Sequence, residues 1–115
     1  MPAALPTSAR RILDVGCGEG AFGRALKARG AEEVVGIETV ETAWRRAKTV
    51  LDNALLGDLE KLDIPYEDGH FDCICCGDVL EHLVDPVAAL KKLSRVLAPD
   101  GHFVISIPNV RFYQV

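Results

Sequence analysis

Three alternate glycines, Gly16, Gly18 and Gly20, follow an aspartate, Asp14, in the run Asp-Val-Gly-Cys-Gly-Glu-Gly. Glycine accepts positive φ angles and lets the backbone come close to a ligand. A strand-like apolar run precedes these residues and a helix-like run follows them. One glycine would be enough for a tight turn between two such elements, so three glycines indicate a loop that binds a ligand.

The glycine spacing is compatible with two kinds of ligand. Gly18-x-Gly20-x-x-Gly23 fits a dinucleotide-binding fingerprint, and Glu38 lies one strand later, where an acid for ribose hydroxyls is expected. Asp14 argues against a pyrophosphate, because its carboxylate would repel phosphates and attract an ammonium or sulfonium group. The alternative is that Asp14 only accepts hydrogen bonds from backbone N–H groups of its own loop.

The elements that would position this loop alternate along the chain, short apolar runs with amphipathic segments. This order is typical of a parallel sheet with helices on its faces. We expect strands over 10–15, 33–38, 53–56, 71–76 and 102–107, and helices over 21–29, 41–51 and 86–97. The right-handed crossover rule then favours a doubly wound, mostly parallel five-stranded α/β sheet with helices on both faces, which binds ligands at the carboxyl ends of its strands.

Two further patterns predict what faces the core. The last helix, 86–97, carries an apolar stripe of Leu90, Leu93 and Leu97, which is expected to face the core. Its basic residues, Lys91, Lys92 and Arg95, are expected to face water. The four cysteines, Cys17, Cys73, Cys75 and Cys76, lack the C-x-x-C spacing of a zinc or redox site. We expect reduced core thiols and no metal, with Cys73 and Cys75 on one face of a strand and Cys76 on the other.

The composition restricts the class of protein. The chain has 115 residues, 49% of them hydrophobic and 26% charged, and a formal net charge of −4. These values favour one globular domain, residues 1–115, and argue against disorder. The acidic excess argues against nucleic acid as a partner. No apolar run reaches the roughly 18–20 residues that span a bilayer, and the N-terminus does not resemble a signal peptide, so we expect a cytoplasmic protein without a membrane partner.

Five ordered segments resemble the motifs of the class I S-adenosylmethionine-dependent methyltransferases, and the likeness extends from residue 12 to about residue 110. They are ILDVGCGEGAFG (12–23), VVGIET (34–39), LLGDLE (55–60), FDCICCGDVLEH (71–82) and LSRVLAPDGH (93–102). The glycine run alone is a weak signal. The specificity comes from the order of the whole set.

The resemblance implies a Rossmann-like methyltransferase core that uses S-adenosyl-L-methionine and releases S-adenosyl-L-homocysteine. It also implies that Glu38 binds both ribose hydroxyls and that Asp58, with the N–H of Leu59, contacts the adenine edge. The loop after the fourth strand would contact the methionine portion. The implied cofactor-binding residues are Asp14, Gly16, Cys17, Gly18, Gly20, Glu38, Thr39, Asp58, Leu59, Gly77 and Asp78.

The acceptor side is less clearly marked in the sequence. His82 and Asp78 are the candidate catalytic residues, and His82, which follows Glu81, would act as a general base. A structural role for His82 at the start of a helix is the alternative. Residues expected to line the acceptor side are Asp78, Glu81, His82, Pro108 and Asn109.

Three functions follow from these patterns. The first is methyl transfer to a small-molecule acceptor. The second is a non-catalytic module that binds S-adenosylmethionine or a nucleotide. A dehydrogenase is third, because Asp14 disfavours it and the chain has no room for a substrate domain.

The resemblance also bears on the C-terminus. Members of the family usually continue past the fifth strand with a helix and two further strands, whereas this chain stops at Val115. An apolar edge strand over 103–107 favours pairing with another chain. We therefore expect either a fragment of a longer methyltransferase or a homodimer through this edge.

Overall fold

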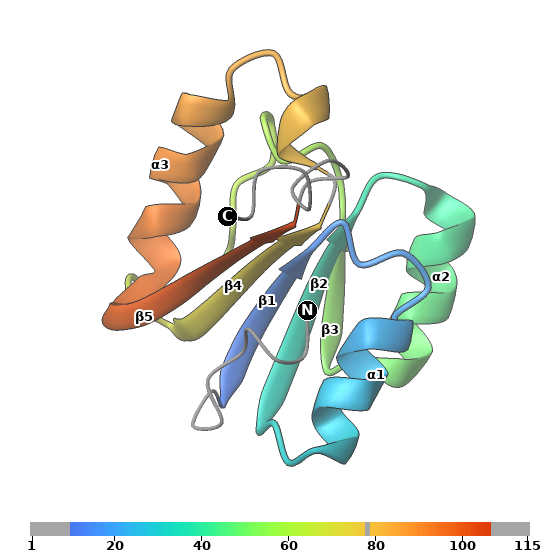
Figure 1. Cartoon of the computed structure of the whole chain (residues 1–115). Coiled ribbons are helices and arrows are strands. Elements are labelled where there is room, and N and C mark those ends of the chain that lie inside the picture. The colour runs from blue at the N-terminus through green and yellow to red at the C-terminus, as the bar shows by residue number, and fades with distance from the viewer. Residues whose placement is uncertain (1–9, 78, 107–115) are drawn as a thin grey trace, which may run out of the picture.

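Five parallel strands form one sheet in the order β3-β2-β1-β4-β5 (Figure 1). The strands are β1 (Arg11–Val15), β2 (Glu33–Glu38), β3 (Asn53–Leu56), β4 (Phe71–Gly77) and β5 (Leu97–Ser106). The computed structural model describes residues 10–77 and 79–106; three candidates, Asp78, Pro108 and Asn109, lie outside them. The strand order reverses between β1 and β4, and such a switch point places a crevice at the carboxyl ends of these two strands.

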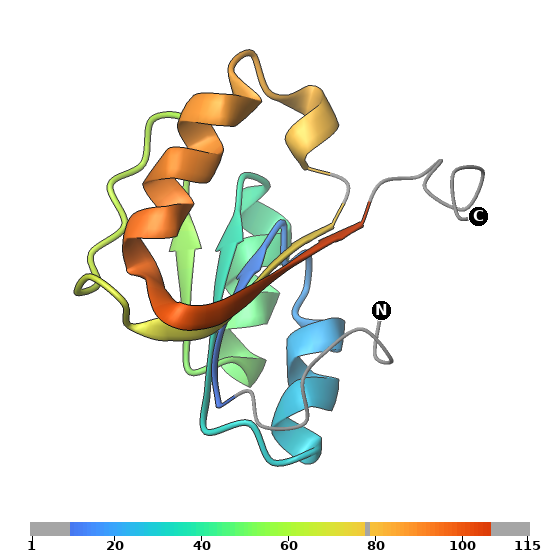
Figure 2. The same cartoon turned by 60° about the vertical axis from the view of Figure 1, so that its left-hand side comes forward.

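Helices cover both faces of the sheet, as predicted. The helical elements are α1 (Ala21–Ala28), α2 (Glu41–Val50), α3 (Pro86–Val96) and a short 3₁₀ turn, η2 (Leu80–His82). Figure 2 shows α3 on one side of the sheet and α1 and α2 on the other. The fold is a doubly wound, Rossmann-like α/β sheet. No helix among the described residues is long and apolar enough to cross a membrane.

Two apolar cores result from the alternation of side chains along the strands. Leu13 and Val15 of β1 pack on the α3 side, whereas Ile12 packs on the side of α1 and α2. The cysteines of β4 follow the same alternation. Cys73 and Cys75 lie in the α1–α2 core and Cys76 lies in the α3 core, which confirms the predicted faces. All four cysteines are buried and free.

The inward face of α3 differs from the predicted one. Ala89, Leu93 and Val96 are the buried residues of this helix, while Leu90 is only partly buried and Leu97 already belongs to β5. Positions 89, 93 and 96 follow the i, i+4, i+7 spacing of one helical face. The start of the helix is confirmed, because the side chain of Asp85 accepts a hydrogen bond from Ala88 N at 3.1 Å.

Of the three basic residues of α3 predicted to face water, Lys91 and Arg95 are exposed, whereas Lys92 is partly buried. Lys92 donates to the carbonyl oxygens of Leu59 and Leu62, at 2.8 and 2.9 Å. Arg95 donates to the carbonyl oxygens of Ile64 and Tyr66 and to the carboxylate of Asp68. The amphipathic pattern of a helix shows which side avoids the core, but it does not show that a distant loop covers that side.

The start of β5 also differs from the prediction. Leu97 pairs with Phe71 and His102 pairs with Cys73, so residues 98–101 bulge opposite the single residue Asp72. The sequence predicted that Pro99, Asp100 and Gly101 form a turn before a strand that begins at residue 102. The strand instead begins at Leu97 and contains the irregularity, and β-bulges of this kind keep a strand paired while extra residues are accommodated.

Candidate functional site

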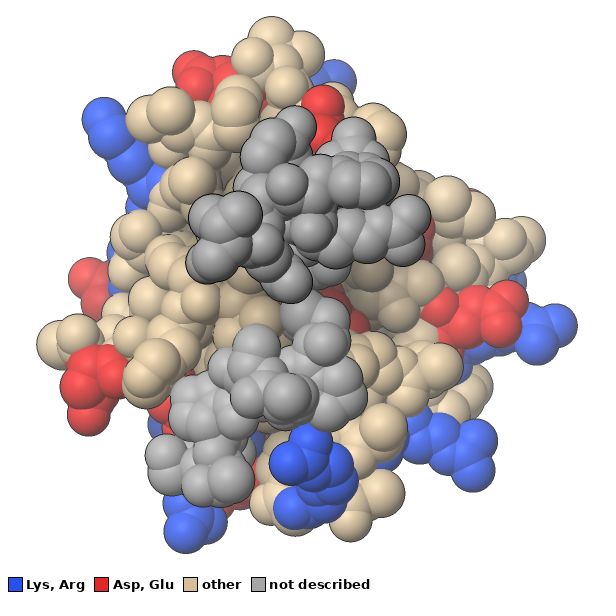
Figure 3. Space-filling model, viewed as in Figure 1, with Lys and Arg blue, Asp and Glu red and all other residues tan. Residues whose placement is uncertain are grey.

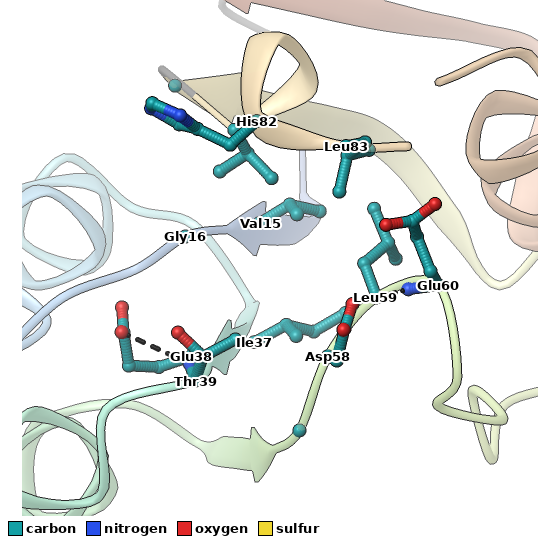
Figure 4. Close-up of a pocket in the computed structure, with 13 residues that line it drawn as sticks. Val15, Gly16, Ile37, Glu38, Thr39, Asp58, Leu59, Glu60, His82 and Leu83 are labelled. Atoms are coloured by element: carbon teal, nitrogen blue, oxygen red, sulfur yellow. Dashed lines mark hydrogen bonds between the residues drawn. The ribbon is translucent and has the colours of Figure 1, made fainter. Parts of the chain in front are cut away.

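A pocket of about 430 Å³ lies at the carboxyl ends of the strands, beside the switch point (Figure 4). Its size falls within the range of roughly 300–1,000 Å³ that is typical of small-molecule sites. The pocket is lined by residues from the ends of β1, β2 and β4, from the segment after β3, and from η2 and its flanks. These residues are Val15, Gly16, Ile37, Glu38, Thr39, Gly57, Asp58, Leu59, Glu60, Gly77, Val79, His82 and Leu83.

The glycine loop after β1 is held against the end of β2. Gly16 N and Cys17 N both donate to Ile37 O, at 2.8 and 3.0 Å. Gly16 has a φ of 78°, and an added Cβ there would lie 2.4 Å from Cγ2 of Val79. Only glycine therefore fits at this position without a shift of the pocket wall. Gly20, with a φ of 94°, stands at the N-terminus of α1.

Glu38 ends β2, and backbone N–H groups orient its carboxylate. Oε1 accepts a hydrogen bond from Gly18 N at 2.8 Å, and Oε2 accepts from Thr39 N and Val40 N at 3.1 and 3.0 Å. Figure 4 shows the side chain folded back beside Thr39. A carboxylate has about four acceptor positions. The hydrogen bonds within the described residues use three, which leaves a position at Oε1 for a hydroxyl donor.

Asp58 begins a single helical turn, residues 58–62, after β3. Its Oδ1 accepts from Glu60 N at 2.9 Å, and its carbonyl oxygen accepts from Lys61 N and Leu62 N. Leu59 is only 3% exposed, so its side chain packs in the core. In Figure 4 the carboxylates of Asp58 and Glu60 extend from the same loop. Asp58 thus both closes the turn and lines the pocket.

Asp14, near the carboxyl end of β1, does not line the pocket. It is 6% exposed, and it is the buried charged residue of the described chain. Burial and, to a smaller extent, the negative charge of Glu38 together raise the pKa of its carboxyl to about 7. Within the described residues, none of the hydrogen bonds from its loop's backbone N–H groups goes to this carboxylate. This finding disfavours the alternative that Asp14 only holds its own loop.

The pocket brings together seven of the predicted site residues and leaves others outside its lining. Those in the lining are Gly16, Glu38, Thr39, Asp58, Leu59, Gly77 and His82; those outside it are Asp14, Cys17, Gly18 and Gly20. Cys17 is 7% exposed, and burial raises the pKa of its thiol to about 12. The thiol therefore stays protonated at neutral pH and is not a nucleophile.

Sequence reasoning assigned no site role to Glu60, Val79 and Leu83, which also line the pocket. The carboxylate of Glu60 accepts from Val84 N at 3.2 Å and from Asp85 N at 2.9 Å. It therefore bridges the turn after β3 and the segment after η2. Their positions in the sequence could have indicated a role in the pocket, since Glu60 follows Asp58 closely, and Val79 and Leu83 lie on either side of His82.

His82 lies at the mouth of the pocket on η2. Its side chain is 75% exposed, and its Nε2 lies 3.5 Å from Oε1 of Glu81. Glu81 is exposed and does not line the pocket. Water or an acceptor molecule can therefore reach the imidazole, and the neighbouring carboxylate favours one orientation of the ring.

The charge of the pocket restricts its ligand. The described lining contains three carboxylates, those of Glu38, Asp58 and Glu60, and no lysine or arginine. Such a lining favours a ligand with hydroxyl donors or a positive charge over one with a pyrophosphate. Across the described residues, no group of three or more His, Cys, Asp or Glu side chains is arranged to hold a metal ion. On the visible part of the face in Figure 3, basic and acidic side chains are interspersed.

Two curated relatives align with most of this chain. The ubiquinone biosynthesis O-methyltransferase of Acinetobacter baylyi is 30% identical over 106 residues, which are 87% of this chain and 44% of that protein. The enzyme of the same description from Neisseria meningitidis serogroup A is 33% identical over 108 residues, which are again 87% of this chain and 44% of that protein. The chain thus spans less than half the length of these relatives.

A solved structure has the same fold. The S-adenosylmethionine-dependent methyltransferase from Mesorhizobium loti superposes with a TM-score of 0.82 at 32% identity, over 92% of this chain and 50% of that one. The family described as "Methyltransferase domain" matches residues 13–105, which include every strand end that lines the pocket. This chain belongs to the methyltransferase domain family.

Proposed function

We propose that this domain binds S-adenosylmethionine in the pocket, and that the whole protein transfers the methyl group to a small-molecule acceptor. One observation carries the proposal. The carboxylates of Glu38 and Asp58, from the ends of two neighbouring strands, line the same pocket beside Gly16 of the glycine loop. An adenosyl ligand presents ribose hydroxyls and an adenine edge, which are donors for two such acceptors.

The residues present fit this cofactor. Glu38 keeps an acceptor position for a ribose hydroxyl, and Asp58 with the N–H of Leu59 would contact the adenine edge. Among the described residues, no atom lies within 4 Å of a Cβ added at Gly77, so this part of the chain leaves the backbone there open to the methionine portion. The acidic lining favours the positive charge of the sulfonium.

The bound cofactor would supply a methyl group that its sulfonium already activates. The chain's own residues then have to align the acceptor with that methyl group and exclude water. An acceptor hydroxyl must lose its proton as it attacks, and the imidazole of His82 at the pocket mouth would take that proton. Asp78, which lies outside the described residues, stays a predicted catalytic partner.

The proposed acceptor is a small molecule with a hydroxyl group, since the curated relatives are described as ubiquinone biosynthesis O-methyltransferases. Two finer predictions belong to the same proposal. A homodimer would form through the edge of β5, the last strand in the sheet order, where Ile105 is 41% exposed. The protein would act in the cytoplasm.

Calorimetric titration tests cofactor binding. We expect saturable binding of S-adenosylmethionine and S-adenosylhomocysteine and no binding of NAD; affinity for NAD alone would overturn the proposal. Methyl transfer is tested by incubating the whole protein with methyl-labelled cofactor and catechol or phenol acceptors. Cofactor binding without transfer to any acceptor would favour the non-catalytic binding module.

A further inference from the structure

The turn formed by residues 58–62 presents its backbone to two different surroundings. On one side, Asp58, Leu59 and Glu60 line the pocket. On the other side, the carbonyl oxygens of Leu59 and Leu62 point at α3. The turn closes with the hydrogen bond from Leu62 N to Asp58 O at 2.8 Å, and the chain then leaves the helical path. Carbonyls at the end of a helical turn need partners from elsewhere.

Lys92 of α3 supplies those partners. Its Nζ donates to Leu59 O at 2.8 Å and to Leu62 O at 2.9 Å, and the side chain is partly buried. Hydrogen bonds from an ammonium group are stronger than neutral ones, and a positive charge is favourable at the carbonyl end of a helical turn. Glu60 adds a second connection through its hydrogen bonds to Val84 N and Asp85 N.

We propose that Lys92 is a positioning residue for ligand binding, because it fixes the turn 58–62 in the orientation that presents Asp58 and Leu59 to the pocket. This inference rests on the proposed function, in which those two residues contact the adenine. Lys92 does not line the pocket, so any effect it has on affinity acts through the turn. Glu60 lines the pocket and is less suitable for the test.

Arg95 gives a matched control on the same helix. Its guanidinium donates to Ile64 O at 2.7 Å, to Tyr66 O at 2.9 Å and to Oδ1 of Asp68 at 2.8 Å. Arg95 therefore holds the later part of the same segment, whose residues do not line the pocket. If Lys92 only stabilised the fold, replacing Lys92 and replacing Arg95 should have the same effect on ligand affinity.

The experiment compares Lys92→Met with Arg95→Met and with Lys91→Met, a change at an exposed neighbour. Titration calorimetry measures the Kd for S-adenosylhomocysteine and for 5′-deoxyadenosine, which contains the adenosyl half alone. We expect Lys92→Met to raise both Kd values about tenfold and the controls to change them less than twofold. Lys92→Arg, which keeps the charge and several donors, should restore most of the affinity.

Hydrogen exchange without ligand gives a second readout. We expect the amides of residues 59–62 to exchange faster in Lys92→Met than in Arg95→Met. Equal Kd values for these two variants, or unchanged exchange at residues 59–62, would overturn the inference. If Lys92→Met does not fold, Lys92→Gln replaces it under the same criteria. Failure of the unaltered protein to bind S-adenosylhomocysteine would instead overturn the proposed function, and the exchange data would still decide whether Lys92 holds the turn.

Discussion

The carboxylate of Glu38 accepts a hydrogen bond from the backbone N–H of Gly18 at 2.8 Å, which joins the end of β2 to the glycine loop after β1. Gly18 has a φ of 57°, in the left-handed region that favours glycine. The bond orients Glu38 and at the same time fixes the loop. The proposed ribose contact and the geometry of the glycine loop therefore depend on one side chain.

Replacement of Glu38 by Gln should weaken the binding of S-adenosylhomocysteine by about 10- to 100-fold, because the amide loses the charge and places a donor group among backbone donors. The pKa of Asp14 should fall as well, since the charge of Glu38 helps to raise it. Calorimetry and NMR titration measure the two effects. Glu41→Gln, at an exposed acid that pairs with Arg45, is the control and should leave the Kd within twofold. Equal Kd values for the two variants would contradict the assignment.

Replacement of Asp14 by Asn should make the folded protein more stable at pH 8. The carboxyl titrates near 3.8 in the unfolded chain and at about 7 in the folded one. Its contribution to stability is therefore fully present below pH 3.8 and is lost as the pH rises to 7. Asn does not ionise, so the variant should gain on the order of 4 kcal/mol at pH 8 and little at pH 4. Urea unfolding at several pH values measures this gain in stability. A gain that does not change with pH would show that ionisation of Asp14 is not its cause.

Two short strands were the most predictable elements. The predicted bounds 33–38 and 53–56 agree with β2 and β3 residue for residue, because each is a short apolar run between turn signals. The bulge of β5 was not predictable, since Pro99 and Gly101 mark a turn in any local pattern. Whether that turn lies before the strand or within it depends on pairing with β4.

The site residues divide in the same way. Gly16, Glu38 and Asp58 were predictable because the glycine spacing and the family resemblance mark them, and each lies at or just after the carboxyl end of a strand. Parallel strands bring these ends to one edge of the sheet. Glu60 and Lys92 were not predictable, because their contacts join a turn after β3 to the segment around α3. Such contacts depend on how a long loop packs, and no spacing within the sequence encodes that packing.

Gly16→Ala should destabilise the fold by about 2–4 kcal/mol. The new Cβ would require a left-handed φ of 78°, at a cost of about 1–2 kcal/mol, and would lie 2.4 Å from Cγ2 of Val79. The close approach to the Val79 side chain can be removed by shortening that side chain. In the double variant with Val79→Ala, part of the stability should return while the backbone strain remains, so the two changes should couple in a double-mutant cycle measured by urea unfolding. Strictly additive losses would show that Val79 does not limit the space at Gly16.

His82→Gln should lower kcat for hydroxyl acceptors by about 10²-fold while the Kd for S-adenosylhomocysteine stays within twofold, because the imidazole lies at the pocket mouth with most of its surface exposed. The loss should shrink as the assay pH rises, since an acceptor that ionises by itself needs no base. Steady-state kinetics of the whole protein with a phenol acceptor measure this dependence. His70→Gln is the matched control, because His70 pairs with Glu33 at 2.7 Å at the start of β2, at the other end of the strands, and should leave kcat unchanged. A His82→Gln variant with unaltered kcat at every pH would remove His82 from the catalytic residues and leave deprotonation to solvent or to another group.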